Sequence, residues 1–316
     1  MKLTLSVYFV IFQFVPRQPS VAALRRLSKA FNEKVIPLIV REYTLDVNRS
    51  PRSFALHKYN RVPPFIRFLE RLTFKNFYGD APSQRILNQV ALRHGSSLQR
   101  VCLNFRHRLA NCEAAARILE DLERLVALSH LELFIYHDAN VAPLLQAAVD
   151  ADELQLGERV RTLRIHIEDD AFMHLHGSTV ERFIGRFTNL RKLAFFADGE
   201  HIRPARYLRP GAVERVAFRF TGPSPAFLRA VVQDLACKDV QHISLRETDK
   251  FPGSHSQTNL HQVLLSQRCV RSLHLRNLFG LDLMKTLSCL PSTLRELRIH
   301  RINFTIKHLR SLSESF

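Results

Sequence analysis

Ten basic residues between Arg71 and Arg298 occupy matching positions in a repeated apolar motif, and eight of the ten are arginine. A guanidinium group presents a planar fork of N–H donors, which binds a carboxylate or a phosphate through two hydrogen bonds at once. The chemistry that these side chains predict is therefore recognition of anionic groups. The ten residues are Arg71, Lys75, Arg100, Arg164, Lys192, Arg215, Arg219, Arg246, Arg276 and Arg298.

Short strands are the elements that would position these side chains. The pattern apolar-x-x-apolar-x-apolar occurs nine times, from LERLTF at residue 69 to LRELRI at residue 294, and VREYTL at residue 40 is an earlier copy. The first and last of the nine starts are 225 residues apart, which gives a repeat of about 28 residues. Positions 1, 4 and 6 of each copy would face the core, and positions 3, 5 and 7 would face outward.

The outward positions concentrate the positive charge of the chain, whose formal net charge is +17. Lys or Arg fills 10 of these 27 positions, compared with 46 of the 316 residues overall, and only Glu132 and Glu296 are acidic. This enrichment predicts that the face binds an acidic or phosphorylated protein. The alternative is that arginine is merely a polar residue that tolerates strands and covers apolar surface with its stem. Histidine fills five further outward positions, His130, His166, His242, His274 and His300.

The segments between the strands show the apolar period of helices, with apolar residues at i, i+3, i+4 and i+7. Ser178 and Glu181 have the S-x-x-E spacing of a capping box, which predicts that a helix begins there. The clearest helical segments run from Val141 to Ala148, from Val180 to Phe187 and from Leu228 to Leu235.

A strand and a helix in every 28 residues resemble a leucine-rich repeat solenoid of the longer, helix-backed type. We therefore expect an α/β fold, an irregular horseshoe with parallel strands on the concave side and helices on the convex side. The family's Asn or Cys at position 9 is replaced, for example by Arg106, Tyr136 and Glu168, so loops of varied shape are expected. Residues 41–316 are predicted to form this repeat domain, and residues 1–40 an N-terminal helical cap.

The stretch before the repeats reads L-x-R-L-S-K-x-F-N, followed by V-x-P-L-x-x-R, between Leu24 and Arg41. It resembles the C-terminal half of an F-box, particularly in fungal F-box proteins with leucine-rich repeats. The resemblance implies a substrate receptor of an SCF-type cullin–RING ubiquitin ligase, with a Skp-type adaptor and a cullin as partners. The alternative is that Val21–Val35 is only the helix that caps the solenoid. The residues implied to bind the adaptor are Leu24, Leu27, Phe31, Val35 and Pro37.

No sequence motif indicates catalysis, and we expect neither an enzyme nor a cofactor nor a bound metal. The chain contains no phosphate-binding loop, no G-x-S-x-G and no H-E-x-x-H. His174 and His176 form an H-x-H pair, expected in a connecting loop, which is a weak signal for a metal site. Basic neighbours are expected to lower the pKa of the Cys102 thiol, but no motif places a base beside it.

Other partners and compartments are weaker interpretations. Nucleic acid would suit the charge, but Phe134 and Phe196 are the only phenylalanine, tyrosine or tryptophan residues at outward positions, and stacking platforms need more. Five scattered cysteines predict reduced thiols in the cytoplasm or nucleus. The apolar run Leu3–Val15 is too short to span a membrane, and it suggests a secretory signal, a cap on the fold or a misread gene start. The functional alternatives are a repeat scaffold without a ligase link and a secreted repeat protein.

Overall fold

The structure, a computed structural model, describes the repeat region and not the predicted cap. The expected helix and F-box-like residues of segment 1–40 lie outside the described residues. The described residues are 42–46, 69–77, 81–106, 109, 111–136, 139–197, 203, 205–221, 230–231, 233–235, 239–248, 269–277, 287 and 290–300.

Ten strands and five helices are defined in this part of the chain. The strands are β1 (Glu42–Asp46), β2 (Arg71–Phe77), β3 (Arg100–Phe105), β4 (His130–Ile135), β5 (Thr162–Ile167), β6 (Lys192–Ala197), β7 (Arg215–Thr221), β8 (His242–Thr248), β9 (Ser272–Arg276) and β10 (Glu296–His300). The helices are α5 (Ala81–His94), α6 (Cys112–Glu123), α7 (Ala142–Asp150), α8 (Gln155–Arg159) and α9 (Asp170–Gly185). Among the described residues, no helix is both long enough and apolar enough to cross a bilayer.

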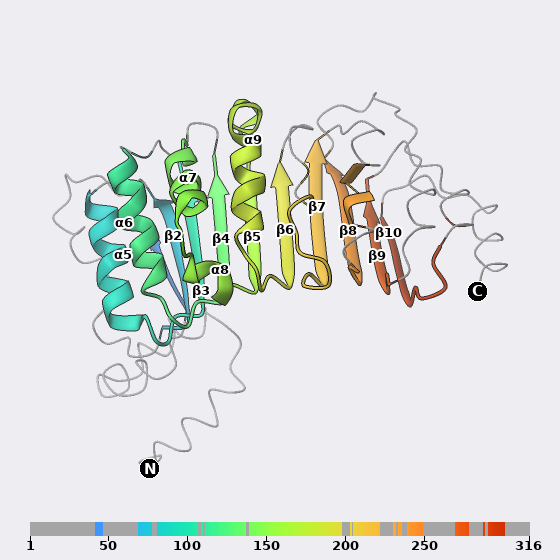
Figure 1. The fold of residues 1–316 in the computed structure, drawn as a ribbon, viewed down its shortest axis with the longest axis horizontal. Helices are drawn as coiled ribbons and strands as arrows, with labels where there is room; N and C mark the ends of the chain where they lie inside the picture. Colours follow the sequence, from blue (N-terminus) through green and yellow to red (C-terminus); the bar gives the residue numbers. More distant parts are fainter. Residues whose placement is uncertain are drawn as a thin grey trace, which may run out of the picture.

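The ten strands form one parallel sheet, and their order in space follows their order in the chain, from β1 to β10. Helices α5 to α9 lie together on one face of this sheet, over the strands between β2 and β6 (Figure 1). Each repeat therefore adds one strand to the end of the sheet, and the repeats together form an α/β solenoid, as the sequence predicted.

The apolar motif determines where every strand begins. Each of the nine predicted copies forms a strand that starts two residues after the first apolar residue of the motif, and the earlier copy forms β1. The first apolar residue is at most 7% exposed in all nine copies, so it anchors the start of the strand in the core. These anchors are Leu69, Leu98, Leu128, Val160, Leu190, Val213, Val240, Val270 and Leu294.

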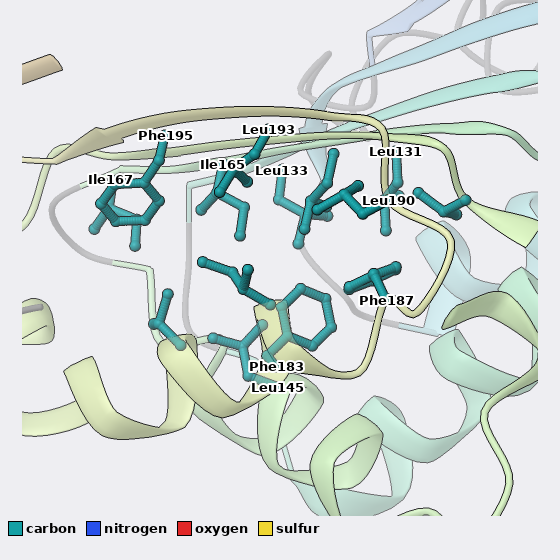
Figure 2. Close-up of a cluster of buried hydrophobic side chains, with 14 of the residues drawn as sticks. Leu131, Leu133, Leu145, Ile165, Ile167, Phe183, Phe187, Leu190, Leu193 and Phe195 are labelled. Atoms are coloured by element: carbon teal, nitrogen blue, oxygen red, sulfur yellow. The ribbon is translucent and has the colours of Figure 1, made fainter. Parts of the chain in front are cut away.

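The hydrophobic core fills the space between the sheet and the helices. In β4, Leu131 and Leu133 are each 1% exposed, whereas the alternating residues His130 and Glu132 are only partly buried. This alternation is that of a strand with one face in the core. Figure 2 shows the inward residues of the strands facing the helix residues Leu145 and Phe183, and Phe187, which follows α9.

Backbone hydrogen bonds at the start of the strands fix the register of the sheet. The carbonyl oxygen of Glu70 accepts hydrogen bonds from the N–H groups of both Gln99 and Arg100, each at 2.9 Å. The same pair of bonds joins each following strand to the next, as far as β10. A shift of one residue would turn every side chain to the other face of its strand, so these bonds help to decide which side chains face outward.

Asparagine and aspartate side chains cap two of the helices. Asn111 accepts a hydrogen bond from the N–H of Ala114 at 2.8 Å where α6 begins. Asp169 accepts one from the N–H of Phe172 at 3.1 Å where α9 begins. Each carboxylate or amide oxygen satisfies an N–H group that has no partner within the helix.

The predicted capping box at Ser178 and Glu181 is wrong. Because Asp169 already caps α9, this helix begins at Asp170 and Ser178 lies in its interior. Glu181 is 8% exposed, and its carboxylate accepts a hydrogen bond from the backbone N–H of Arg203. It therefore links α9 to the connection between β6 and β7, and it does not cap a helix.

The connections differ from repeat to repeat, as the missing position-9 residue predicted. Between β4 and β5 the chain forms two helices, α7 and α8. Between β6 and β7, the described residues 205–214 form turns instead. Close packing between repeats is clearest at Gly157, where a Cβ would lie 2.3 Å from the carbonyl oxygen of Arg186.

Candidate functional site

The face of the sheet opposite the helices, which we call the open face, carries three rows of side chains. The parallel register places the same motif position of neighbouring strands side by side, so each row crosses the strands. Row one is Glu42, Arg71, Arg100, His130, Thr162, Lys192, Arg215, His242, Ser272 and Glu296. Row two is Thr44, Thr73, Cys102, Glu132, Arg164, Ala194, Ala217, Ser244, His274 and Arg298. Row three is Asn104, Phe134, His166, Phe196, Arg219, Arg246, Arg276 and His300.

Acidic residues engage the predicted arginines near the N-terminal end of the sheet. Nη1 of Arg71 lies 3.0 Å from Oε1 of Glu42. Glu132 is only 14% exposed at its side chain, and its carboxylate lies 3.6 Å from both Arg100 and Arg164. These arginines already have anionic partners within the chain, so they contribute less charge to an external ligand. Lys75, also on this side of the sheet, is exposed on β2.

Glu296 has the same role in the last described strand. It forms an ion pair with Arg298 and accepts a hydrogen bond from the hydroxyl of Ser272 at 2.8 Å. The hydrogen bond from Ser272, followed by that from Arg298, lowers the pKa of the Glu296 carboxyl below its usual value. Arg298 therefore also has its anion within the chain.

The remaining five predicted residues form a basic patch on strands β6 to β9. The twelve open-face positions of these strands contain no acidic residue. Small residues, Ala194, Ala217 and Ser244, fill row two between the basic side chains of rows one and three. The basic patch consists of Lys192, Arg215 and Arg276, which are exposed, and Arg219 and Arg246, which are partly buried.

The spacing of the basic patch suits anions. Arg219, Arg246 and Arg276 lie in register on three adjacent strands, and adjacent strands are about 4.8 Å apart. Two neighbouring guanidinium groups can therefore bind one phosphate or one carboxylate together. The sequence placed these residues on one face, and the structure shows that they are neighbours.

Two histidines of row one contribute little to the positive charge. Burial, followed by the positive charge of Arg100, lowers the pKa of His130. Burial, followed by the positive charge of Arg215, lowers the pKa of His242. Both imidazoles therefore favour the neutral form near pH 7, and lysine and arginine carry the charge of the basic patch.

An aromatic ladder, formed by Phe134, His166 and Phe196, lies beside the basic patch in row three. The ring centroids of Phe134 and His166 are 5.3 Å apart, and those of His166 and Phe196 are 5.7 Å apart. The two phenylalanines look isolated in the sequence because the ring between them is a histidine. All three residues occupy position 7 of consecutive motifs, and that shared position is the signal that could have revealed the ladder.

The expectation for the Cys102 thiol is wrong. Cys102 is 7% exposed, and burial, followed by the negative charge of Glu132, raises its pKa to about 12. Arg164 and Arg100 act in the expected direction, but their effect is smaller than that of burial. The thiol is therefore protonated near pH 7, and its hydrogen bond goes to Oδ1 of Asn104 at 3.2 Å.

The His174–His176 pair lies within helix α9 and not in a connecting loop. Residues two apart on a helix point to different sides, so the two imidazoles do not converge on one ion. The His176 ring packs against that of Phe172, with centroids 4.9 Å apart. Within the described part of the chain, no three His, Cys, Asp or Glu side chains are grouped as a metal site.

A hollow of about 540 Å³ lies at the edge of the sheet where β4 to β6 begin. Its lining carries both signs of charge, including Glu158, Arg161 and Arg191. Nη2 of Arg159, also in the lining, donates to the carbonyl oxygen of Glu123 at 2.6 Å. The lining residues belong to none of the three rows, so the hollow is separate from the basic patch.

No family model matches the chain, and no curated protein matches it. Among solved structures, the chain is similar to the crystal structure of the leucine-rich repeat-containing protein LegL7 from Legionella pneumophila, with 12% identity and a TM-score of 0.45. The match covers 86% of this chain and 98% of that chain. At this identity and TM-score, neither residue roles nor partners can be transferred from one protein to the other.

Proposed function

We propose that this protein is an interaction module that binds an acidic or phosphorylated protein segment on the open face of its sheet. The observation that supports the proposal most strongly is the composition of β6 to β9, where the open-face positions hold the five residues of the basic patch and no acid. Elsewhere on the face, Glu42, Glu132 and Glu296 supply ion-pair partners to arginines. The open-face positions of β6 to β9 therefore combine five basic residues with no acidic one, whereas the rest of the face carries both signs of charge.

A matched pair of charge reversals tests this proposal. The patch variant carries Arg215→Glu, Arg219→Glu and Arg246→Glu. The control variant makes the same change of net charge on the helices, at three exposed arginines. These are Arg85 and Arg93 of α5 and Arg182 of α9.

The readout is the fluorescence anisotropy of labelled acidic peptides, with and without phosphoserine, titrated with each protein. The patch variant should bind at least about tenfold more weakly than the unaltered protein, a loss of about 1.4 kcal/mol. The control variant should bind nearly as well, and the affinity should fall as salt is added. Equal weakening by both variants would mean that net charge alone attracts the peptide, and the proposal would be wrong.

A role as substrate receptor of an SCF-type ubiquitin ligase is a second proposal. It is supported only by the F-box-like sequence between Leu24 and Arg41, which directly precedes β1 and lies outside the described residues. Co-purification with a Skp-type adaptor tests it, using the unaltered chain and a variant with Leu27→Asp and Phe31→Asp. Adaptor bound to the first and lost from the second would support the receptor role. Absence of adaptor from both would leave an interaction scaffold without a ligase link.

The proposal also places the protein in a reducing compartment, the cytoplasm or nucleus, and gives it no catalytic step. Cys102, Cys112 and Cys269 are free thiols, which supports such a compartment. The raised pKa of Cys102 argues against its use as a nucleophile. Measurement of the cellular location with a fluorescent tag at the C-terminus tests the compartment, and secretion would contradict it.

A further inference from the structure

Row three of the open face consists of two chemically distinct halves, one after the other along the row. On β4, β5 and β6 it presents the aromatic ladder, Phe134, His166 and Phe196. On β7, β8 and β9 it presents three arginines in unbroken register with the ladder, Arg219, Arg246 and Arg276.

Both rings of the phenylalanines are only partly buried, so the ladder offers apolar surface on a face where other positions are mostly polar. Beyond the ladder, just after the ends of β3 and β4, the guanidinium carbon of Arg106 lies 5.0 Å from the ring centroid of Tyr136. Phenylalanine and tyrosine side chains therefore occur beside β4 to β6 and not at the open-face positions of β7 to β9.

The two halves also differ in how acidic and basic residues are mixed: Arg164 and Lys192 occur with Glu132 on β4 to β6, whereas the four arginines of β7 to β9 occur with no acidic residue at an open-face position. The aromatic half contains Glu132, beside Arg100 and Arg164, and Glu168, whose Oε1 lies 3.5 Å from Nε2 of His166. The arginine half contains no acidic residue at an open-face position. An acidic ligand group is therefore more favoured over the arginines than over the ladder, where Glu132 and Glu168 offset the basic residues.

We infer that the ligand of the open face is an extended peptide with an aromatic half, which packs on the ladder, and an acidic half, which binds the three arginines. The inference rests on the proposed function, because it specifies the sequence of the same protein partner. Six strands about 4.8 Å apart span about 24 Å, and an extended chain rises about 3.3 Å per residue. The segment is therefore about eight residues long and runs across the strands.

A protein segment fits these halves better than a single-stranded nucleic acid. A nucleic acid carries a phosphate at every nucleotide, so its backbone would meet Glu132 and Glu168 wherever its bases stacked on the ladder. A peptide can confine its negative charge to one half. The two-part pattern of the surface therefore matches a two-part peptide sequence.

The test uses the full chain and three labelled peptides of about eight residues. The first peptide has tyrosines in one half and glutamates in the other, and it is made in both orders because the direction of binding is not fixed by the rows. In the second peptide the tyrosines are replaced by serine. In the third the glutamates are replaced by glutamine. Anisotropy gives the affinity of each for the unaltered protein and for a variant with Phe134→Thr and Phe196→Thr.

The inference predicts that one order of the first peptide binds about tenfold or more tightly than the serine peptide, because the rings bury apolar surface on the ladder. That advantage should disappear in the threonine variant. Threonine suits a strand, so the sheet should persist, and thermal unfolding of the variant checks this. If the variant does not fold, the comparison between peptides on the unaltered protein still decides.

The outcomes separate this inference from the proposed function. Equal binding of the tyrosine and serine peptides, with both weakened by reversal of the basic patch, would overturn the inference and leave the proposed function standing. Failure of every acidic peptide to bind would overturn both. Tighter binding of a single-stranded oligonucleotide of about eight nucleotides, with loss in the threonine variant, would replace the peptide with nucleic acid.

Discussion

Cys102 shows, at the scale of one residue, that burial outweighs charge. Its position between arginines in the sequence pattern indicated a lowered pKa. The thiol is instead 7% exposed, and its pKa is raised to about 12, mainly by burial. A sequence pattern identifies the neighbours of a residue on a strand, but it does not give the depth of the residue below the surface. That depth decided the direction of the shift.

Cys102 should therefore resist alkylation in the folded protein. A pKa of about 12 leaves roughly one thiol in ten thousand ionised at about pH 8, and the thiolate is the reactive form. Cys112 is exposed where α6 begins, and it should react much faster and serve as the internal control. Brief iodoacetamide labelling followed by peptide mass mapping measures both rates. Equal labelling of the two cysteines would show that Cys102 is neither buried nor protonated.

His130 should make the protein less stable in mild acid. Burial and Arg100 lower its pKa in the folded state, whereas in the unfolded chain it takes its ordinary value near 6.5. As the pH falls through about 6.5, the unfolded chain binds a proton that the folded state disfavours, so the free energy of unfolding decreases. His130→Gln should reduce this decrease between about pH 7.5 and about pH 5.5 in urea titrations. His300→Gln, at the exposed end of β10, is the control, and identical pH profiles for wild type and His130→Gln would refute the assignment.

At the scale of elements, the strands were predictable and the helix ends were not. Each strand follows a local rule: one apolar residue anchors its start, and the next apolar residues alternate toward the core. The start of α9 depends instead on competition between two caps, Asp169 and Ser178, that both satisfy local sequence rules. Asp169 comes first, and the residues after it bury Phe172 and Met173, at 5% and 1% exposure, so the helix begins there. The second capping signal is then only an interior helical residue.

Removing each of the two competing cap side chains should lower the free energy of unfolding by different amounts. Asp169→Ala deletes the acceptor for the N–H of Phe172 and should lower the free energy of unfolding by about 1 kcal/mol. Ser178→Ala, at an exposed interior position of the same helix, should change it by less than about 0.5 kcal/mol. Urea unfolding followed by circular dichroism measures both. A larger cost for Ser178→Ala than for Asp169→Ala would place the start of the helix at the second cap.

At the scale of the whole molecule, the candidate site arises from repetition. No single repeat contains a binding site, because each contributes only three side chains to the open face. The parallel register places those contributions in rows, so that residues from β6 to β9, separated by tens of positions in the chain, become neighbours. The motif positions in the sequence predicted which residues lie on the open face. The sequence did not show which arginines near the N-terminal end of the sheet have acidic partners, because the pairs formed by Glu42 and Glu132 join different strands.

The most direct measurement of the central claim is photo-crosslinking of an acidic peptide to the full chain, with mass spectrometry of the crosslinked residues. The peptide carries a diazirine group beside its glutamates. Crosslinks should fall on the open face of β6 to β9, near Lys192, Arg215 and Arg276, and an excess of unlabelled acidic peptide should suppress them. Crosslinks concentrated on helices α5 to α9, or spread evenly over the surface, would contradict the claim that this face binds acidic protein segments.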